Sequence, residues 1–346
     1  MPRLQITCPL NSLGYGVASI GLCKELDCNI YPIGQSDIPE KYQHNLLPKI
    51  ERGFLLQNRD LPSLRIYHQF DLAHHIGKNI HIGFPIFELD NFNPREIAHI
   101  QANDIIFVCS NWAKNIVQEN VAKHVEVIPL GVDRDVFHEN VKPSHTRHKF
   151  TFLNVGKWEK RKRHDILYKS FARAFSNKND VRLIMCCDNP FLSPSQTEEW
   201  KNLYRRSLGN KVEFVSRMKT QEELASLMAI ADCGVFPSRA EGWNLELLEM
   251  MSMGKMVIST NYSAHTEFAN KNNCQLLSVT RLEKAIDNIW FHGQGNWMSI
   301  EEKEINELAD LMLDVYNNSY VNKEGIETAK QFSWSNSAKK ILDIIH

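Results

Sequence analysis

The 346-residue sequence predicts an α/β protein with two domains, each an open parallel sheet covered by helices on both faces. Short β-branched or apolar runs alternate with longer amphipathic runs nearly throughout. A polar segment with Pro143, residues 131–149, interrupts this alternation near the middle. The length is also too great for one ordinary domain. We therefore expect a first domain at 1–135, a linker at 136–148, a second domain at 149–330 and a C-terminal helix at 331–346 that can cross back to the first domain.

The individual elements follow from these patterns. The strands of the first half are expected within 4–7, 30–34, 65–70, 80–87, 104–110 and 125–130. Helices are expected after Gly16 and over 111–121, the second with Ser110 or Asn111 as its N-cap. The strands of the second half are expected within 149–156, 181–187, 211–216, 232–238 and 256–260. The helices of that half are expected at 164–175, 197–208, 220–230 and 244–254, the last closed by Gly254, and then at 281–293, 301–318 and 333–345.

Composition excludes several classes of protein. The formal net charge of −1 provides no global field that would attract nucleic acid or anionic lipid. The first residues lack the basic start and apolar run of a signal peptide, and no stretch approaches the about 18 apolar residues of a membrane span. The eight cysteines form no Cys-x-x-Cys pair, so reduced buried thiols are expected rather than disulfides or a zinc site. We expect a cytoplasmic protein.

A basic turn follows the first strand of the second half. In NVGKWEKRKRHD, residues 154–165, Gly156 permits a tight turn and five cations precede the next helix. Cations at the carboxyl end of a parallel strand can neutralise a bound phosphate. A solvated basic loop explains the same residues equally well.

A short apolar helix carries two carboxylates. In SRAEGWNLELLEMMSMG, residues 238–254, Glu241 precedes a helix that begins around Asn244, and Glu249 lies about one turn inside it. The backbone amides from Asn244 to Glu246, including Leu245, and the positive end of the helix dipole are suited to a diphosphate. Glu249 can accept hydrogen bonds from a ribose diol, and Glu241 from hydroxyls beyond the phosphate. The alternatives are a surface turn residue for Glu241 and a structural carboxylate for Glu249.

These stretches together resemble the retaining, GT-B-fold glycosyltransferases of family 4. The two glutamates of EGWNLELLE (241–249) are similar to that family's Glu-x7-Glu signature, and residues 152–175 resemble its phosphate-binding strand, loop and helix. The family's interdomain segment resembles residues 127–137, and the last strand–helix unit of its first domain resembles residues 104–117. Its closing helix resembles residues 331–342. The sequence departs from the pattern at Asn244, where glycine is common, at Glu246, where proline is common, and at Lys157, where arginine is common.

The resemblance implies an α/β GT-B architecture, two Rossmann-like domains facing across a cleft, and transfer of a sugar from a nucleotide-diphosphate sugar with retention of configuration. No cofactor and no obligatory metal are implied. Lys157 and Lys162 would hold the donor diphosphate, Glu249 the ribose and Glu241 the transferred sugar. Residues Asn244, Leu245 and Glu246 would assist at the phosphates.

The first domain is less specific. Gly14 and Gly16 occupy the place of a glycine-rich loop near the donor, and a simple strand-to-helix turn explains them as well. Glu88, at the end of a predicted strand, could take the part of the family's first-domain histidine or serve as a salt-bridge carboxylate. The spacing of His68, His74, His75 and His81 matches no common metal motif, so no metal site is expected. Trp290, Phe291 and Trp297 could stack on a sugar, and we favour instead that they pack a junction between the domains.

Two other functions share these features. One is a GT-B-fold sugar-nucleotide isomerase or phosphorylase, and the other is a non-catalytic nucleotide-sugar-binding subunit. The acceptor is left open among a glycan, a lipid-linked sugar, a protein, a small molecule and a modified nucleic acid, and peripheral contact with a membrane is left open too.

Overall fold

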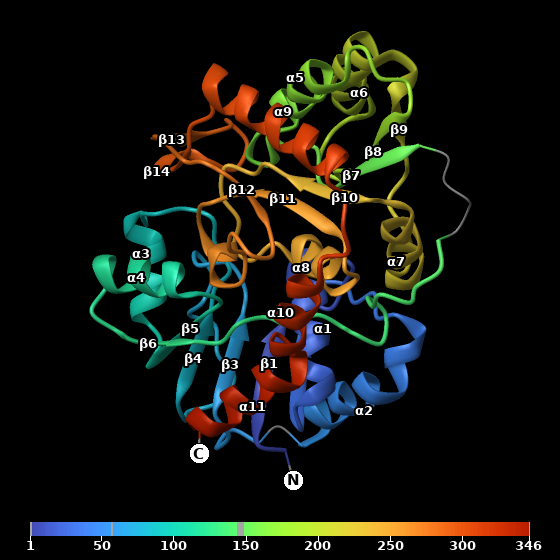
Figure 1. Ribbon diagram of the computed structural model, residues 1–346. Coiled ribbons are helices and arrows are strands. Elements are labelled where there is room, and N and C mark those ends of the chain that lie inside the picture. Colours follow the sequence, from blue (N-terminus) through green and yellow to red (C-terminus); the bar gives the residue numbers. More distant parts are fainter. Residues whose placement is uncertain (1, 57, 144–148, 346) are drawn as a thin grey trace. The chain divides into compact units, whose positions relative to one another are not determined.

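The computed structural model describes residues 2–56, 58–143 and 149–345 (Figure 1). The chain divides into two compact units. Unit 1 comprises residues 1–133, 263–267 and 331–346, and unit 2 comprises residues 134–262 and 268–330. The first unit therefore collects its residues from three separate segments of the chain. The expected linker at 136–148 lies partly outside the described residues.

Unit 1 contains a six-stranded parallel sheet with the order β2-β1-β3-β4-β5-β6. Its strands are β1 (Leu4–Cys8), β2 (Cys28–Pro32), β3 (Ser63–Ile66), β4 (His81–Phe84), β5 (Ile105–Val108) and β6 (His124–Val127). Its helices are α1 (Gly14–Glu25), α2 (Glu40–Leu56), α3 (Pro94–Gln101), α4 (Asn111–Asn120) and α11 (Trp334–Ile345). Ser110, one of the two expected residues, is the N-cap of α4, since its hydroxyl accepts from the Ala113 amide.

Unit 2 contains a second six-stranded parallel sheet, with the order β12-β11-β10-β7-β8-β9. Its strands are β7 (Phe150–Gly156), β8 (Val181–Cys187), β9 (Val212–Phe214), β10 (Cys233–Phe236), β11 (Met256–Thr260) and β12 (Gln275–Leu277). Its helices are α5 (His164–Phe175), α6 (Pro194–Leu208), α7 (Gln221–Ile230), α8 (Leu245–Ser252), α9 (Glu302–Asn317) and α10 (Lys323–Gln331). Gly254, with φ of +69°, follows α8 as expected, and its amide donates to Met251.

Residues 281–293 do not form the expected helix. They contribute to an antiparallel hairpin of β13 (Leu282–Ile286) and β14 (His292–Met298). In the turn, one carboxylate oxygen of Asp287 accepts hydrogen bonds from the amides of Ile289, Trp290 and Phe291. A side chain that bonds nearby amides in this way offers the backbone an alternative to a helix. Asn288 and Gly293, both with positive φ, complete the reversal.

The C-terminal helix α11 packs against α1 within unit 1. Trp334, at its first position, is buried, and a Cβ atom added to Gly21 of α1 would lie 2.4 Å from the Trp334 ring. Only glycine allows this approach. All eight cysteines are buried and free, and within the described part of the chain no helix has the length and apolarity needed to cross a membrane.

Candidate active site

The candidate site of unit 2 lies where the strand order of its sheet reverses. Strands β7 and β10 are neighbours, with Cys233 paired to Phe152, but the chain continues from β7 toward β8 on one side and from β10 toward β11 on the other. The loops that leave β7 and β10 therefore diverge at this position. In open parallel sheets, ligands bind beside the carboxyl ends of strands at such a switch point.

The loop after β7 folds three of its cations inward, Arg161, Lys162 and Arg163. Lys160–Lys162 form a single 3₁₀ turn, and Arg163 then adopts a left-handed conformation with φ of 59° before α5 begins. The side chain of Lys162 lies over Gly156, whose Cβ would be 3.5 Å from the Lys162 Cε atom. Arg161 and Lys162 are buried, whereas Lys160 is exposed. Because buried cations require partners, this loop is more than a solvated basic segment.

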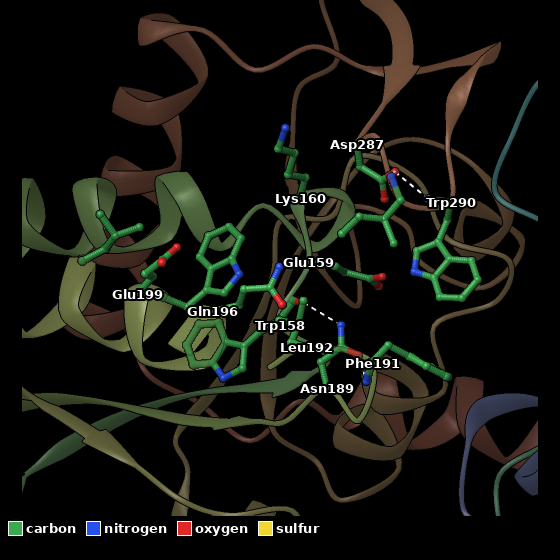
Figure 2. A pocket seen from close by; sticks show the side chains of 13 residues that line it. Trp158, Glu159, Lys160, Asn189, Phe191, Leu192, Gln196, Glu199, Asp287 and Trp290 are labelled. Carbon is green, nitrogen blue, oxygen red and sulfur yellow. Dashed lines mark hydrogen bonds between the residues drawn. The ribbon is translucent and has the colours of Figure 1, made fainter. Parts of the chain in front are cut away.

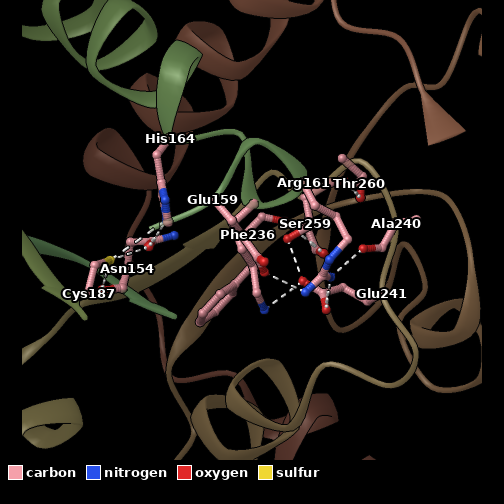
Figure 3. A network of polar contacts seen from close by, with 12 residues as sticks. Asn154, Glu159, Arg161, His164, Cys187, Phe236, Ala240, Glu241, Ser259 and Thr260 are labelled. Carbon is pink, nitrogen blue, oxygen red and sulfur yellow. Dashed lines mark hydrogen bonds and ion pairs between the residues drawn. The ribbon is translucent and has the colours of Figure 1, made fainter. Parts of the chain in front are cut away.

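Glu241, in the loop after β10, is the partner of Arg161 and Lys162 (Figure 3). Its Oε1 atom lies 2.8 Å from Lys162 Nζ, and Oε2 lies 2.8 Å from the Arg161 guanidinium. The Ser238 hydroxyl also donates to Oε1 at 2.6 Å. Arg161 in turn donates to the Ala240 carbonyl at 2.7 Å and to Glu159 at 2.7 Å. One carboxylate thus joins the two loops at the switch point.

These contacts determine the charge states. Burial alone would raise the pKa of Glu241, but the charges of Arg161 and Lys162 and the hydrogen bonds from Lys162 and Ser238 outweigh it, so the pKa lies well below its usual range. Burial alone would lower the pKa of Lys162, but the charges of Glu241 and Glu246 raise it above its ordinary value. Both groups are therefore ionised at neutral pH.

A polar network beneath the loop fixes the start of α5 (Figure 3). Asn154, on β7, donates to the Val235 carbonyl of β10 at 2.6 Å, and its side-chain oxygen lies 3.0 Å from His164 Nε2. Cys187 Sγ donates to the same oxygen at 3.2 Å. Burial and then the charges of Lys162 and Arg161 lower the pKa of His164 to about 3, so the imidazole is neutral. This network joins β7, β8 and β10 to the helix that follows the basic loop.

Helix α8 begins without a side-chain cap. Its N-cap residue, Asn244, has φ of 76°, and among the residues that the structure describes neither its side-chain oxygen nor its nitrogen has a hydrogen-bond partner. Leu245 and Glu246 are half-buried in the first turn. The charge of Glu246 acts on both Lys162 and Glu249, so the first turn of α8 lies near both groups.

Glu249 is buried on α8. Its Oε2 atom has no hydrogen-bond partner among the described residues, and burial, together with the charge of Glu246, raises its pKa well above the usual range. A buried carboxyl group with an unused oxygen has a high free energy unless a ligand supplies a partner. Glu249 is therefore a candidate ligand-binding group.

Lys157 differs from Lys162 in its surroundings. It is half-buried, and its ammonium group lies 5.7 Å from the centroid of the Phe191 ring. The structure therefore brings Lys162 and Glu241 together and gives Lys157 an aromatic neighbour. Arg161 was not singled out by sequence, although it makes the most contacts in the loop; the run of five cations does not reveal which of them turn inward.

The predicted residues of unit 1 lie at the carboxyl ends of its own strands. The helix begins earlier than expected: α1 starts at Gly14, so Gly14 and Gly16 lie in its first turn rather than in a loop before it. A Cβ atom on Gly16 would lie 2.1 Å from the Asn11 carbonyl oxygen, so the chain before α1 requires glycine there. Glu88 follows β4 and is half-buried. The preceding loop is held by Tyr15, whose hydroxyl donates to the Ile86 carbonyl at 2.6 Å and accepts from the Ile86 amide at 2.9 Å.

The clustered histidines serve the fold. His75 stacks on His81 with centroids 4.5 Å apart and lies 2.7 Å from Asn103, and His68 stacks on Phe70. Among the described residues, no group of three or more His, Cys, Asp or Glu side chains is arranged to hold a metal ion.

Comparison with known proteins gives the fold and the family match. Residues 149–318 match the sequence model of the family described as Glycosyl transferases group 1. An uncharacterized glycosyltransferase of Methanocaldococcus jannaschii is 25% identical over 317 residues, which cover 88% of this chain and 76% of that protein. Among solved structures, Anabaena HepE in complex with UDP-glucose superposes with a TM-score of 0.73 at 12% identity, covering 100% of this chain and 99% of the other.

A second solved structure has the same fold over nearly the full length of this chain. Sucrose-phosphate synthase from Thermosynechococcus elongatus gives a TM-score of 0.70 at 15% identity and covers 99% of this chain and 98% of the other. The two Rossmann-like domains and their parallel sheets have the GT-B architecture that the sequence predicted. The match to the Glycosyl transferases group 1 family lies on the unit that carries the basic loop and α8, and the protein is a glycosyltransferase.

Proposed function

We propose that the protein transfers a sugar from a nucleotide-diphosphate sugar to an acceptor with retention of configuration, as in the family 4 enzymes, and that no metal ion is required. The observation that carries this proposal is the buried group of Arg161, Lys162 and Glu241 at the switch point. Ligands bind at such a switch point, and cations held in fixed positions there can neutralise the negative charge of a diphosphate.

The donor diphosphate would lie between the basic loop and the start of α8. Lys162 would contact it, and Lys157 would approach it by leaving the Phe191 ring. The uncapped amides near Leu245 and Glu246, with the unpartnered amide group of Asn244, would supply further hydrogen bonds. These groups would stabilise the negative charge that develops on the leaving nucleoside diphosphate, which is the work that a metal ion performs elsewhere.

Glu249 and Glu241 would bind the sugars on either side of the diphosphate. The unused oxygen of Glu249 would accept a hydrogen bond from the ribose diol. Glu241 would contact the transferred sugar while holding its two cationic partners in position. In unit 1 we propose that Gly14 and Gly16 belong to the donor-binding residues and that Glu88 orients the acceptor hydroxyl.

A thermal-shift screen with nucleotide sugars, beginning with UDP-glucose because Anabaena HepE binds it, tests donor binding. We expect the wild type to be stabilised and the Lys162→Ala and Glu249→Ala variants to lose most of the shift. Lys169→Ala and Glu119→Ala, at exposed positions of α5 and α4, are matched controls that should behave as the wild type. No stabilisation by any nucleotide sugar would contradict the proposal.

The fate of the donor distinguishes the remaining possibilities. Slow release of free sugar, with EDTA present, supports metal-independent transfer, and the anomeric proton of the product, observed by NMR, reports its configuration. A rearranged nucleotide sugar formed from donor alone would indicate an isomerase. Binding without any turnover would indicate a non-catalytic subunit.

A further inference from the structure

Unit 2 contains a cavity of about 300 Å³ beside the basic turn, whose residues Trp158, Glu159 and Lys160 line it (Figure 2). Residues of the β7 loop, the loop before α6, α6 itself and the turn between β13 and β14 line it. In Figure 2, Asp287 and Trp290 enter from one side and Gln196 and Glu199 from the other, with Glu159 between them. The turn that replaces the expected helix therefore forms one wall.

Four aromatic rings surround this cavity. Trp158 and Trp200 stack with centroids 6.0 Å apart and an interplanar angle of 14°. Phe191 packs edge-on against Trp290 at 5.3 Å, and these two side chains remain 54% and 51% exposed. Large aromatic residues left exposed together around a hollow indicate a binding surface. Their flat apolar faces suit the C–H faces of a sugar ring.

Polar groups with unused bonding capacity lie among these rings. Glu199 is exposed and has neither an ion pair nor a hydrogen bond within the described part of the chain. Gln196 uses its oxygen to accept from the Ser193 amide, as part of the cap of α6, which leaves its amide nitrogen available to a ligand. The indole nitrogen of Trp158 is buried and makes no hydrogen bond with any described residue. Hydrogen-bond donors and acceptors thus lie between the apolar faces of the aromatic rings. This arrangement is typical of pockets that bind a ligand in one orientation.

The charges favour a neutral ligand. Three carboxylates and one lysine line the cavity, which disfavours a phosphate or another anion. Two of these carboxylates are already engaged: Glu159 pairs with Arg161 at 2.7 Å, and one oxygen of Asp287 accepts three backbone amides. The ammonium group of Lys157 already occupies the region above the Phe191 ring. Little attraction remains for a second cation.

We propose that this cavity is a binding site for a neutral saccharide, separate from the donor site. The ring of the sugar stacks on Trp290 and Phe191, and its hydroxyls bond to Glu199 and Gln196. Because Glu159 both lines the cavity and pairs with Arg161, a glycan bound here is held beside the basic loop. We infer that the cavity anchors a non-reacting part of a glycan acceptor, and this role rests on the proposed function. The binding of a saccharide to the cavity does not depend on that function.

Saturation-transfer NMR and calorimetry on the full chain, without nucleotide, test the site with neutral di- and tetrasaccharides of glucose, galactose and N-acetylglucosamine. We expect saturable binding that becomes about three- to tenfold weaker in Trp290→Ala and in Phe191→Ala. Both side chains are half-exposed, so these variants should fold. Tyr320→Ala, at an aromatic residue 53% exposed elsewhere on unit 2, should bind as the wild type does.

Two neighbouring glutamates give a second matched pair. Glu199 lines the cavity, whereas the adjacent Glu198 pairs with Arg205. Glu199→Ala should weaken saccharide binding and Glu198→Ala should not. Binding that these variants leave unchanged, or no binding by any saccharide to the limit of its solubility, would overturn the proposal, as would binding of tetramethylammonium in place of sugars.

The Lys162→Ala variant separates the two sites. It should lose donor binding and keep saccharide binding. If the protein binds saccharides but no nucleotide sugar, the proposed function is refuted and the saccharide site is supported. If it binds the donor but no saccharide, the saccharide site is refuted and the proposed function is supported.

Discussion

The ammonium group of Lys162 lies 2.8 Å from a carboxylate oxygen of Glu241, although the two residues follow different strands of one sheet. Both side chains are buried, and Arg161 contacts the same carboxylate. Removing the carboxylate leaves the Lys162 ammonium group buried and without its ion-pair partner, so the contribution of this group can be measured through the stability of the protein.

Glu241→Gln should lower the free energy of unfolding by about 3–5 kcal/mol, because it removes the carboxylate that pairs with Lys162 and one of the two carboxylates that pair with Arg161. Urea unfolding measures the change. Glu213→Gln is the control: Glu213 pairs with Arg182, but its side chain is 47% exposed, so the loss should be below about 1 kcal/mol. Equal losses in the two variants would show that the buried group contributes no more than a surface pair.

The same carboxylate should make unfolding sensitive to acid. The pKa of Glu241 is lower in the folded protein than in the unfolded chain, so the unfolded chain binds the proton more tightly. Its stabilising contribution is present above the unfolded pKa, about 4.3, and is lost as the pH falls toward the folded value. The difference in melting temperature between wild type and Glu241→Gln should therefore shrink below that pH; a difference that stays constant would exclude this linkage.

Glu249 should show the opposite dependence on pH. Its pKa is raised in the folded protein by burial and by Glu246, so its carboxyl group favours folding most when protonated. This contribution is present below the unfolded pKa of about 4.3 and is lost as the pH rises through the folded pKa. Glu249→Gln, which resembles the protonated form, should become progressively more stable than the wild type as the pH rises.

Melting temperatures of both proteins across this range measure that trend. Glu119→Gln, at an exposed position, should show no such trend. A wild type that gains stability over Glu249→Gln with rising pH would mean that the carboxylate has a cationic partner in solution.

His164 should stay neutral wherever the protein is folded above pH 5, because its pKa is lowered to about 3. The lowered pKa means that its contribution to stability is full above the unfolded value of about 6.5 and declines as the pH falls below it. The imidazole resonance, assigned by comparison with a His164→Asn variant, should not shift between pH 5 and 8. Titration near 6.5 would show that the network with Asn154 opens.

Substitution of Gly16 should be more damaging than that of Gly14. A Cβ atom at Gly16 would lie 2.1 Å from the Asn11 carbonyl oxygen, whereas one at Gly14 would have no neighbour within 4 Å among the described residues. Gly14→Ala should therefore leave the free energy of unfolding almost unchanged, and Gly16→Ala should lower it by about 1–3 kcal/mol. Thermal unfolding of the two variants decides this.

The alternation of apolar strands and amphipathic helices was enough to predict two parallel sheets, because that pattern is set by local burial along the chain. It was not enough at residues 281–293, where the Asp287 carboxylate bonds three successive amides and forms a turn instead of a helix. In the site, Glu241 could be singled out from its position before a helix, whereas Lys162 was distinguished from the other cations of its loop only by the family resemblance. Other contacts depend on neighbours in three dimensions that the spacing of residues does not encode. Arg161 pairs with Glu241, and the ammonium group of Lys157 lies over the Phe191 ring.

The three-segment assembly of unit 1 affects how the protein can be divided for study. A fragment that stops at residue 133 would lack Trp334, and the narrow spaces that Gly21 leaves for its indole and Gly131 leaves for its backbone would face solvent. Such a truncation should aggregate or be degraded on expression. A useful isolated half would need residues 331–346 spliced back by a short tether, and any reporter fused at the carboxyl terminus would be attached to the same unit as the amino terminus.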